Sequence, residues 1–370
     1  MKLAILIHGG VDRSGTERVI PGILWMLERL ARHNDVHVFS FNQEPAPGEW
    51  NLVGARVHNT GTAAGWRGRL FRTFAAEHRV APFRVLHAIF GWGGTYGAAL
   101  AWRHRIPMLF HAAGGEFVGL DDIDYGMRAT LVGRIQLGIA CTVAKRVSCA
   151  TGYMQHLVSI RGVRADVVPL GVALDRWPPS EVRRRDVSSP AILLHIGDVR
   201  PVKDQAMLLA AAVRLRDAGI PFELHMAGAD TMHGALRESA NARALGDQLH
   251  WHGVLNRSVL RALVDRAHVL LVSSRHEAGP VAVLEAAVAG VPTVGTAVGH
   301  VADWSPDAAV PVPVSDPQAL AREIAALLHN EPRRVAMAEE AQRRAIAIDA
   351  DHSVAEFERI YREMVASAGR

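Results

Sequence analysis

Short aliphatic runs alternate along the chain with longer stretches whose apolar residues recur every three to four positions. "KLAILIHG" (2–9), "VLHAIF" (85–90) and "HVLLVSS" (268–274) are typical of strands buried on both faces. "DQAMLLAAAVRLRDAG" (204–219) is typical of a helix between two such strands. The alternation predicts parallel sheets with helices on both faces, an α/β fold.

The alternation occurs twice and is interrupted once, by a stretch rich in proline, serine and charge. We therefore expect two facing Rossmann-like, doubly wound domains whose ligands collect at the carboxyl ends of the strands. The expected parts are an N-terminal domain (1–172), a linker (173–190), a C-terminal domain (191–348) and a final amphipathic helix (349–370), which could pack back on the N-terminal domain.

Composition agrees with a two-domain protein of the cytoplasm. The 370 residues exceed one ordinary core, and 49% are hydrophobic. No run of about 18 uncharged apolar residues is present, and the N-terminus reads as a strand rather than a secretory signal. Cys141 and Cys149 form neither a disulfide framework nor a metal-binding spacing.

Charge is uneven along the chain. Residues 1–170 carry 19 basic and 12 acidic residues, a net charge of +7, whereas residues 171–370 carry a net charge of −3. A basic half fits nucleic acid, an anionic membrane or a phosphorylated substrate. No recognition module for nucleic acid accompanies it, so we expect no nucleic-acid partner.

The segment "SSRHEAGPVAVLEAAVAG" (273–290) places two acids eight positions apart at a strand-to-helix turn. Pro280 suits the first turn of a helix that ends near Gly290. The free N–H groups there favour an anion such as a phosphate, and Glu285 has the reach to accept hydrogen bonds from a ribose diol. Alternatively, Glu285 is an exposed helix residue and Glu277 a loop charge.

A second turn, in "AILLHIGDVRPVKDQAMLL" (191–209), carries Arg200 and Lys203 after a strand. Two cations at the carboxyl end of a strand suit a diphosphate. The chain has only three lysines against 38 arginines, which makes Lys203 stand out. Alternatively, both cations are solvated loop charges.

Together these motifs resemble the retaining glycosyltransferases of family 4, which have the GT-B fold and a "glycosyl transferases group 1" C-terminal domain. The family signature is a Glu-x7-Glu turn, here Glu277 to Glu285, followed by Gly290, Pro292 and "TAVG" (296–299). In the N-terminal half, "SGTERVI" (14–20) resembles the glycine-rich loop of the family, and "VVPLGVALDRW" (167–177) resembles the end of its first domain.

The resemblance implies that Glu285 holds the ribose, Glu277 contacts the transferred sugar and Lys203 holds the diphosphate. It assigns supporting contacts with the nucleotide sugar to Gly15, Gly197, Gly279, Pro280, Val281 and, near the base, Val254.

The chain departs from the family pattern at three places, one of which is "EAGP" (277–280), where the family commonly has "EGFG". Asp198 stands where the family usually has an arginine that binds phosphate, and Arg200 could replace that arginine. Ala113 stands where the family has a histidine; His111 could substitute for it or could simply fill the strand end. The neighbouring loop of Gly114, Gly115 and Glu116 can still approach a sugar closely.

The implied reaction transfers a sugar from a nucleotide-diphosphate sugar to a hydroxyl of a sugar or lipid-linked acceptor, with retention of configuration. The expected catalytic residues are Glu277, Lys203 and Arg200, with no metal and no other cofactor, although Asp122-x-Asp124 has the spacing of a metal–diphosphate motif. A nucleotide-sugar epimerase and a non-catalytic nucleotide-sugar-binding protein are the alternatives.

The stretch 65–84 mixes apolar side chains with five arginines. It fits a helix that rests on the anionic inner face of a membrane, making the protein peripheral. It equally fits a helix that packs on its own sheet and exposes a basic edge.

Overall fold

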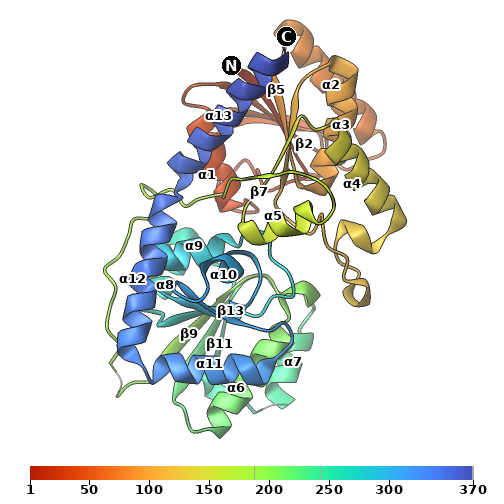
Figure 1. The fold of residues 1–370 in the computed structure, drawn as a ribbon. Coiled ribbons are helices and arrows are strands. Elements are labelled where there is room, and N and C mark those ends of the chain that lie inside the picture. Colours follow the sequence, from red (N-terminus) through yellow and green to blue (C-terminus); the bar gives the residue numbers. More distant parts are fainter. Residues whose placement is uncertain (187, 243, 369–370) are drawn as a thin grey trace. The chain divides into compact units, whose positions relative to one another are not determined.

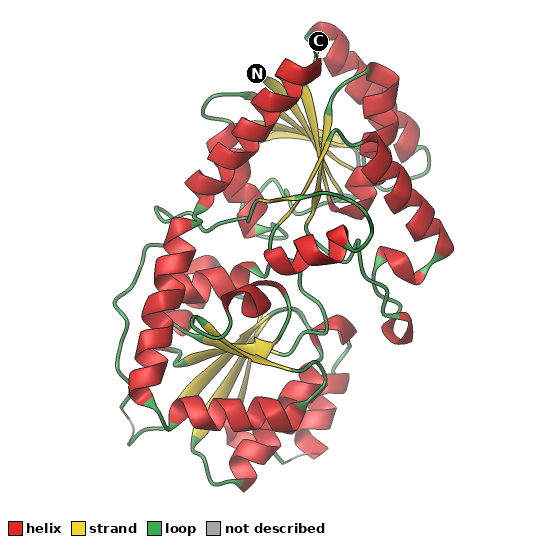
Figure 2. Ribbon diagram, viewed as in Figure 1, coloured by secondary structure: helices red, strands yellow, loops and turns green. Residues whose placement is uncertain are grey.

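The computed structural model describes residues 1–186, 188–242 and 244–368 (Figure 1). The chain divides into two compact units, residues 1–171 with 348–370 (unit 1) and residues 172–347 (unit 2). Each unit is an α/β layer structure with a sheet between helices (Figure 2), so the predicted fold class is confirmed.

Unit 1 contains an eight-stranded sheet with the order β3-β4-β2-β1-β5-β6-β7-β8. All neighbouring strands are parallel except β3 and β4. The strands are β1 (Lys2–Ile7), β2 (Asp35–Ser40), β3 (Gly48–Leu52), β4 (Ala55–Asn59), β5 (Val85–Ile89), β6 (Met108–Ala112), β7 (Arg146–Cys149) and β8 (Asp166–Val167). The α-helices are α1 (Pro21–Leu30), α2 (Trp66–Val80), α3 (Phe90–His104), α4 (Leu131–Val143), α5 (Gly152–Ser159) and α13 (Ala350–Ala368).

Unit 2 contains a six-stranded, fully parallel sheet with the order β11-β10-β9-β12-β13-β14. The strands are β9 (Ala191–Ile196), β10 (Phe222–Ala227), β11 (Leu249–Gly253), β12 (Val269–Val272), β13 (Thr293–Thr296) and β14 (Ala309–Val312). The α-helices are α6 (Gln205–Asp217), α7 (Ala235–Ala242), α8 (Arg257–Arg266), α9 (Val281–Val288), α10 (Gly299–Trp304), α11 (Pro317–Leu328) and α12 (Glu331–Ala347).

The last helix, α13, completes the core of unit 1. It packs against α1 and β5 (Figure 1), and Phe357, Ile360 and Tyr361 are fully buried there. The Tyr361 hydroxyl lies 2.6 Å from Nδ1 of His87 in β5, so the tyrosine has a polar partner inside the core. Residues 350–368 are therefore an integral part of unit 1.

The segment 173–190 lies along unit 2. Trp177 is buried, and its Nε1 donates a hydrogen bond of 2.8 Å to the Glu285 carbonyl oxygen. Ser180 Oγ donates to Asp265 Oδ1 at 2.8 Å. These contacts make the segment part of the packing of unit 2.

Two strand regions were not predicted from the sequence. The hairpin of β3 and β4 turns at Val53 and Gly54, whose φ angles are 44° and 89°. Its outer strand, β3, is largely unburied and lacks the aliphatic run of the other strands. The second region is β14, which has only four residues and contains Pro311.

Helix α2 covers most of the stretch 65–84. Leu70 and Phe74 are buried, and the Trp66 ring stacks on Phe41 with 5.2 Å between ring centroids. The apolar side of α2 therefore packs on unit 1, as the second interpretation of this stretch expected. Among the described residues, no helix is both long and apolar enough to cross a bilayer.

Candidate active site

Lys203 and Glu277 meet at the carboxyl ends of two adjacent strands of unit 2. Lys203 ends a short 3-10 turn (Pro201–Lys203) after β9, and Glu277 lies in the loop between β12 and α9. Lys203 Nζ lies 2.5 Å from Glu277 Oε1, and Ser274 Oγ donates to the same oxygen at 2.6 Å. Both charges are largely buried, with 24% and 14% of their side chains exposed.

Two hydrogen bonds fasten the loop after β12 to the turn after β9. Ser273 Oγ donates to the Lys203 carbonyl oxygen at 2.7 Å, and the Arg275 N–H donates to the Val202 carbonyl oxygen at 2.7 Å. Sequence reasoning missed the roles of Ser273 and Ser274. Their signal was two adjacent hydroxyl groups at the end of an otherwise aliphatic strand.

The ion pair keeps Glu277 charged. Burial acts to raise the pKa of Glu277, but the charge and hydrogen bond of Lys203 and the hydrogen bond of Ser274 outweigh burial, so the pKa lies below its usual value. The site thus holds a fixed carboxylate and a fixed ammonium group side by side.

Glu285 lies in the second turn of α9 and is only 6% exposed. Burial raises the pKa of Glu285 to about 7, although the charge of Arg257 acts to lower it. Within the described part of the chain, no group hydrogen-bonds to its carboxylate. Glu285 is therefore not the exposed helix residue of the alternative interpretation.

Helix α9 begins at Val281, and Pro280 precedes it as the N-cap residue rather than lying in the first turn. Gly299 explains the tight loop that precedes α9. With a φ of 52°, Gly299 approaches so closely that a Cβ atom there would lie 2.8 Å from Pro280 Cδ and 3.2 Å from Glu277 Cβ. The last glycine of "TAVG" thus permits the position of the loop that contains Gly279.

Asp198 is turned toward protein groups. Its Oδ1 accepts a hydrogen bond of 2.9 Å from the Ala229 N–H, and its Oδ2 lies 3.5 Å from Arg200 Nη2. Arg200 is 58% exposed and paired with this aspartate, whereas the Lys203 stem passes 3.5 Å from the position of a Cβ on Gly197. The structure therefore brings Lys203, Gly197 and Glu277 together and leaves Arg200 at the rim.

Val254 follows β11 and is 77% exposed, directly after Gly253, whose φ is 64°. Its side chain is thus open to a ligand at the carboxyl end of β11.

In unit 1, Gly15 has a φ of 66° in a loop where the Gly15 N–H donates to the Asp12 carbonyl oxygen. Asp12 also pairs with Arg18. Loop residues 10 and 11 are held by Gln43, whose Oε1 accepts from both of their N–H groups at 2.7 and 2.9 Å. The glycine-rich loop is thus rigidly braced.

His111 belongs to the core. It is fully buried, its Nδ1 lies 2.9 Å from Ser148 Oγ, and burial lowers its pKa to about 3. It fills the strand end, as one of the two alternatives stated, and is a neutral group. Glu116 is also buried and accepts hydrogen bonds from the Gly91 and Gly114 N–H groups at 3.0 and 2.8 Å. Glu116 therefore shapes the loop of Gly114 and Gly115 from inside.

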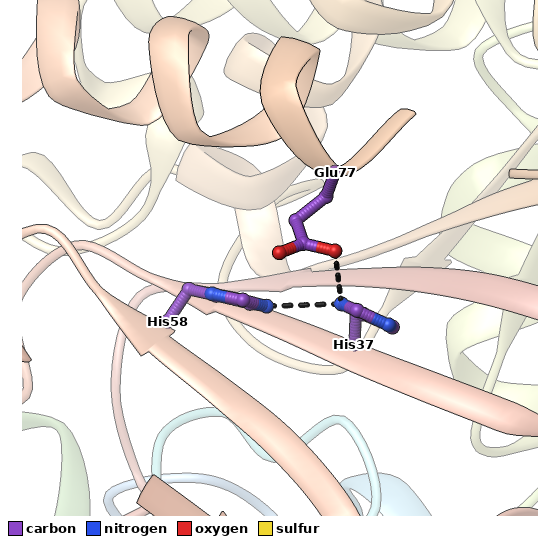
Figure 3. A group of neighbouring side chains, drawn as sticks. All are labelled: His37, His58 and Glu77. Carbon is purple, nitrogen blue, oxygen red and sulfur yellow. Dashed lines mark hydrogen bonds and ion pairs between the residues drawn. The ribbon is translucent and has the colours of Figure 1, made fainter. Parts of the chain in front are cut away.

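Two groups of described residues have the atom types and spacing to hold a metal ion: His37, His58 and Glu77 in unit 1, and Glu223, His225 and His250 in unit 2. In the first group (Figure 3), His37 Nδ1 faces His58 Nε2 at 2.9 Å, and the two rings are within 12° of parallel. This is the geometry of a hydrogen bond.

Lys2 Nζ lies 3.4 Å from the Glu77 carboxylate and supplies the neighbouring positive charge. Neither group includes Asp122, Asp124 or any residue expected in the nucleotide-sugar site.

Two Rossmann-like units, with a buried lysine–glutamate pair and a buried second glutamate at the strand ends of the C-terminal one, have the architecture of the GT-B fold. Residues 181–344 of the 370-residue chain match the family model for glycosyl transferases group 1.

The comparison with curated and solved proteins agrees. The chain is 28% identical over 325 residues to a D-inositol 3-phosphate glycosyltransferase of Geodermatophilus obscurus, covering 80% of this chain and 70% of that protein. Sucrose-phosphate synthase from Thermosynechococcus elongatus superposes with a TM-score of 0.83 at 16% identity, over 99% of both chains. HepE of Anabaena, in complex with UDP-glucose, gives a TM-score of 0.76 at 14% identity over 99% of this chain and 100% of that one.

Proposed function

We propose that this glycosyltransferase takes its sugar from a nucleoside-diphosphate sugar and passes it to an acceptor hydroxyl with retention of anomeric configuration. The observation that carries the proposal is the Lys203–Glu277 ion pair at adjacent strand ends, with Glu285 buried eight residues further on. The relative crystallised with UDP-glucose supports a donor of this class.

Glu285 would hold the ribose. A buried carboxylate without a hydrogen-bond donor is unfavourable, and the two hydroxyl groups of a ribose would supply the missing donors. The bound nucleotide would therefore favour the ionised form of Glu285.

Lys203 would hold the diphosphate. As the bond to the sugar breaks, negative charge develops on the leaving diphosphate, and a fixed ammonium group stabilises that charge in the transition state. The N–H groups at the start of α9, around Val281, would add their partial positive charge. Arg200, which is exposed, would assist only from the rim.

Glu277 would orient the transferred sugar. Its carboxylate is already engaged by Lys203 and Ser274, so it is suited to accept hydrogen bonds from sugar hydroxyls rather than to attack the anomeric carbon. The acceptor hydroxyl would then attack from the face that the diphosphate leaves, and the departing diphosphate would accept its proton. This course retains the configuration.

The proposal requires no metal ion, since Lys203 and the α9 N-terminus supply the positive charge. It places the enzyme in the synthesis of a polysaccharide, glycolipid or glycoconjugate, with a sugar or lipid-linked acceptor. Transfer should continue unchanged in EDTA, whereas loss of activity that Mg²⁺ or Mn²⁺ restores would overturn this part.

Thermal unfolding in the presence of UDP, GDP and ADP tests the donor class. We expect one nucleotide at 100 times its Kd to add about 2.7 kcal/mol of stability, a shift of several degrees in Tm. The nucleotide sugar of the same base should act similarly. No shift with any nucleotide or nucleotide sugar would contradict the proposal.

A further inference from the structure

Helix α4 of unit 1 is apolar on two opposite faces. Helix α4 packs against α3 (Figure 1), and Gly133, Leu137 and Ala140 of α4 are buried. The opposite face carries four large aliphatic side chains that are 71, 65, 55 and 50% exposed: Leu131, Val132, Ile135 and Ile139. Their spacing along α4 forms one stripe. A row of large exposed aliphatic side chains usually marks an interaction site, so this stripe indicates a binding surface.

Three arginines lie at the N-terminal end of the stripe. Arg128, Arg134 and Arg161 line a cavity of about 350 Å³, which Phe117, Leu157 and one acid, Asp121, also line. Arg134 Nε donates to the Arg128 carbonyl oxygen at 2.8 Å. Burial and the charges of Arg161 and Arg134 lower the pKa of Arg128, which shows how close the three positive charges are.

Among the described residues that line the arginine cavity, Asp121 is the one acid against three arginines. Among the described residues, none of these three arginines forms an ion pair. Helix α4 contains no aspartate or glutamate, and residues 1–170 carry a net charge of +7. An arginine guanidinium group can donate two parallel hydrogen bonds to two oxygens of one phosphate, so the cavity suits a phosphate group.

We propose that α4 is a membrane-docking helix: its stripe inserts between the acyl chains of an anionic bilayer while the arginine cavity holds a lipid phosphate. An amphipathic helix with a basic border lies in the membrane interface in this way. A second copy of the chain would cover the stripe but would leave the arginine cavity without an anion. The inference goes beyond the proposed function and does not depend on it.

Co-sedimentation of the full-length protein with vesicles tests the surface. The protein should bind vesicles that contain phosphatidylglycerol, should not bind pure phosphatidylcholine, and should bind less as salt rises. Arg128→Gln with Arg134→Gln should weaken the partitioning by about 25-fold, since each arginine near an anionic surface contributes about fivefold. Ile135→Ser with Ile139→Ser should also weaken it, by about tenfold or more.

The matched control is Arg72→Gln with Arg79→Gln on α2. Both arginines are exposed and hydrogen-bond only along their own helix. This pair should bind vesicles as the unchanged protein does. Arg72, Arg79, Ile135 and Ile139 are all exposed, so their substitution should leave the fold intact. Circular dichroism melting should confirm that every variant is folded.

Four results would overturn the inference. The first is no binding to anionic vesicles, and the second is equal loss of binding in the α2 control. The third is a dimer in sedimentation velocity, without vesicle binding, that Ile135→Ser with Ile139→Ser dissociates. That result would assign the stripe to contact with a second copy of the chain. Binding of inorganic phosphate alone, without vesicle binding, would assign the cavity to a soluble phosphate and would equally overturn it.

Discussion

At the scale of single residues, Glu285 lies in an environment that disfavours its ionised form, which is the form proposed to bind the ribose. The carboxyl group is buried within α9, and its pKa of about 7 compares with a usual value of 4.5. The folded protein therefore binds this proton more tightly than the unfolded chain does. Its contribution to stability is fully present below pH 4.5 and is lost as the pH rises to about 7. Above that range, the ionised group destabilises the free protein.

Replacing Glu285 by glutamine should separate stability from binding. At pH 8, Glu285→Gln should stabilise the nucleotide-free protein by up to about 3 kcal/mol, because the neutral amide no longer carries a buried charge. The same change should abolish the nucleotide-dependent rise in Tm. Thermal unfolding at pH 5 and pH 8, with and without nucleotide, measures both effects.

The control is the unchanged protein over the same pH range. Its nucleotide affinity should fall as the pH decreases below about 7, because ribose hydroxyls favour the ionised form of Glu285. An affinity that does not change between pH 5 and pH 8, or a glutamine variant that still responds to nucleotide, would remove Glu285 from the ribose site.

At the scale of elements, the loop that contains Glu277 depends on close packing between the starts of α9 and α10. Gly299 combines a φ of 52° with a Cβ position only 2.8 Å from Pro280 Cδ. Gly219 has a φ of 71° but open space around it, so it isolates the effect of backbone conformation. The two glycines form a matched pair within unit 2.

Gly299→Ala should therefore reduce both stability and turnover, while Gly219→Ala should reduce stability alone. Each left-handed alanine costs about 1 kcal/mol. In Gly299→Ala, the loop of Glu277 must also move, and a shift of about 1 Å near the chemistry lowers turnover by about a hundredfold. Comparison of denaturation curves and kcat for the two variants checks this. Equal turnover in both would show that the loop tolerates the displacement.

Much of the fold and part of the site could be predicted from the sequence. Continuous aliphatic runs mark parallel buried strands, so β1, β9 and β12 were predictable, whereas β3 has a mostly exposed outer face and no such run. The Glu277–Glu285 spacing located the candidate site. The Ser273 and Ser274 contacts and the turn of Asp198 toward Ala229 arise from tertiary packing, which no local pattern encodes.

At the scale of the whole molecule, unit 1 is formed by two separate segments of the chain, and unit 2 by the segment between them. The chain leaves unit 1 after residue 171, builds unit 2, and returns at residue 348 to complete unit 1 with α13. The residues proposed to bind the nucleotide sugar, Lys203, Glu277 and Glu285, all belong to unit 2, while Gly15 and Glu116 belong to unit 1.

Fragments should reflect this division. Residues 172–347 should fold alone and show a cooperative melting transition. Residues 1–171 alone should aggregate, because they lack the buried α13 side chains Phe357, Ile360 and Tyr361. Joining 348–370 to 1–171 through a flexible linker should restore solubility. A soluble, cooperatively melting 1–171 fragment would contradict the structural role of α13.

The central claim is that the Lys203–Glu277 centre transfers sugar from a nucleotide donor. The most direct measurement is the acceptor-dependent release of nucleoside diphosphate, with the anomeric configuration of the product read by NMR. We predict a retained configuration and a loss in kcat of about 100- to 1,000-fold in Lys203→Ala, with a smaller loss in the exposed Arg200→Ala. Near-normal turnover in Lys203→Ala, or a nucleotide sugar that is isomerised without transfer, would contradict the account.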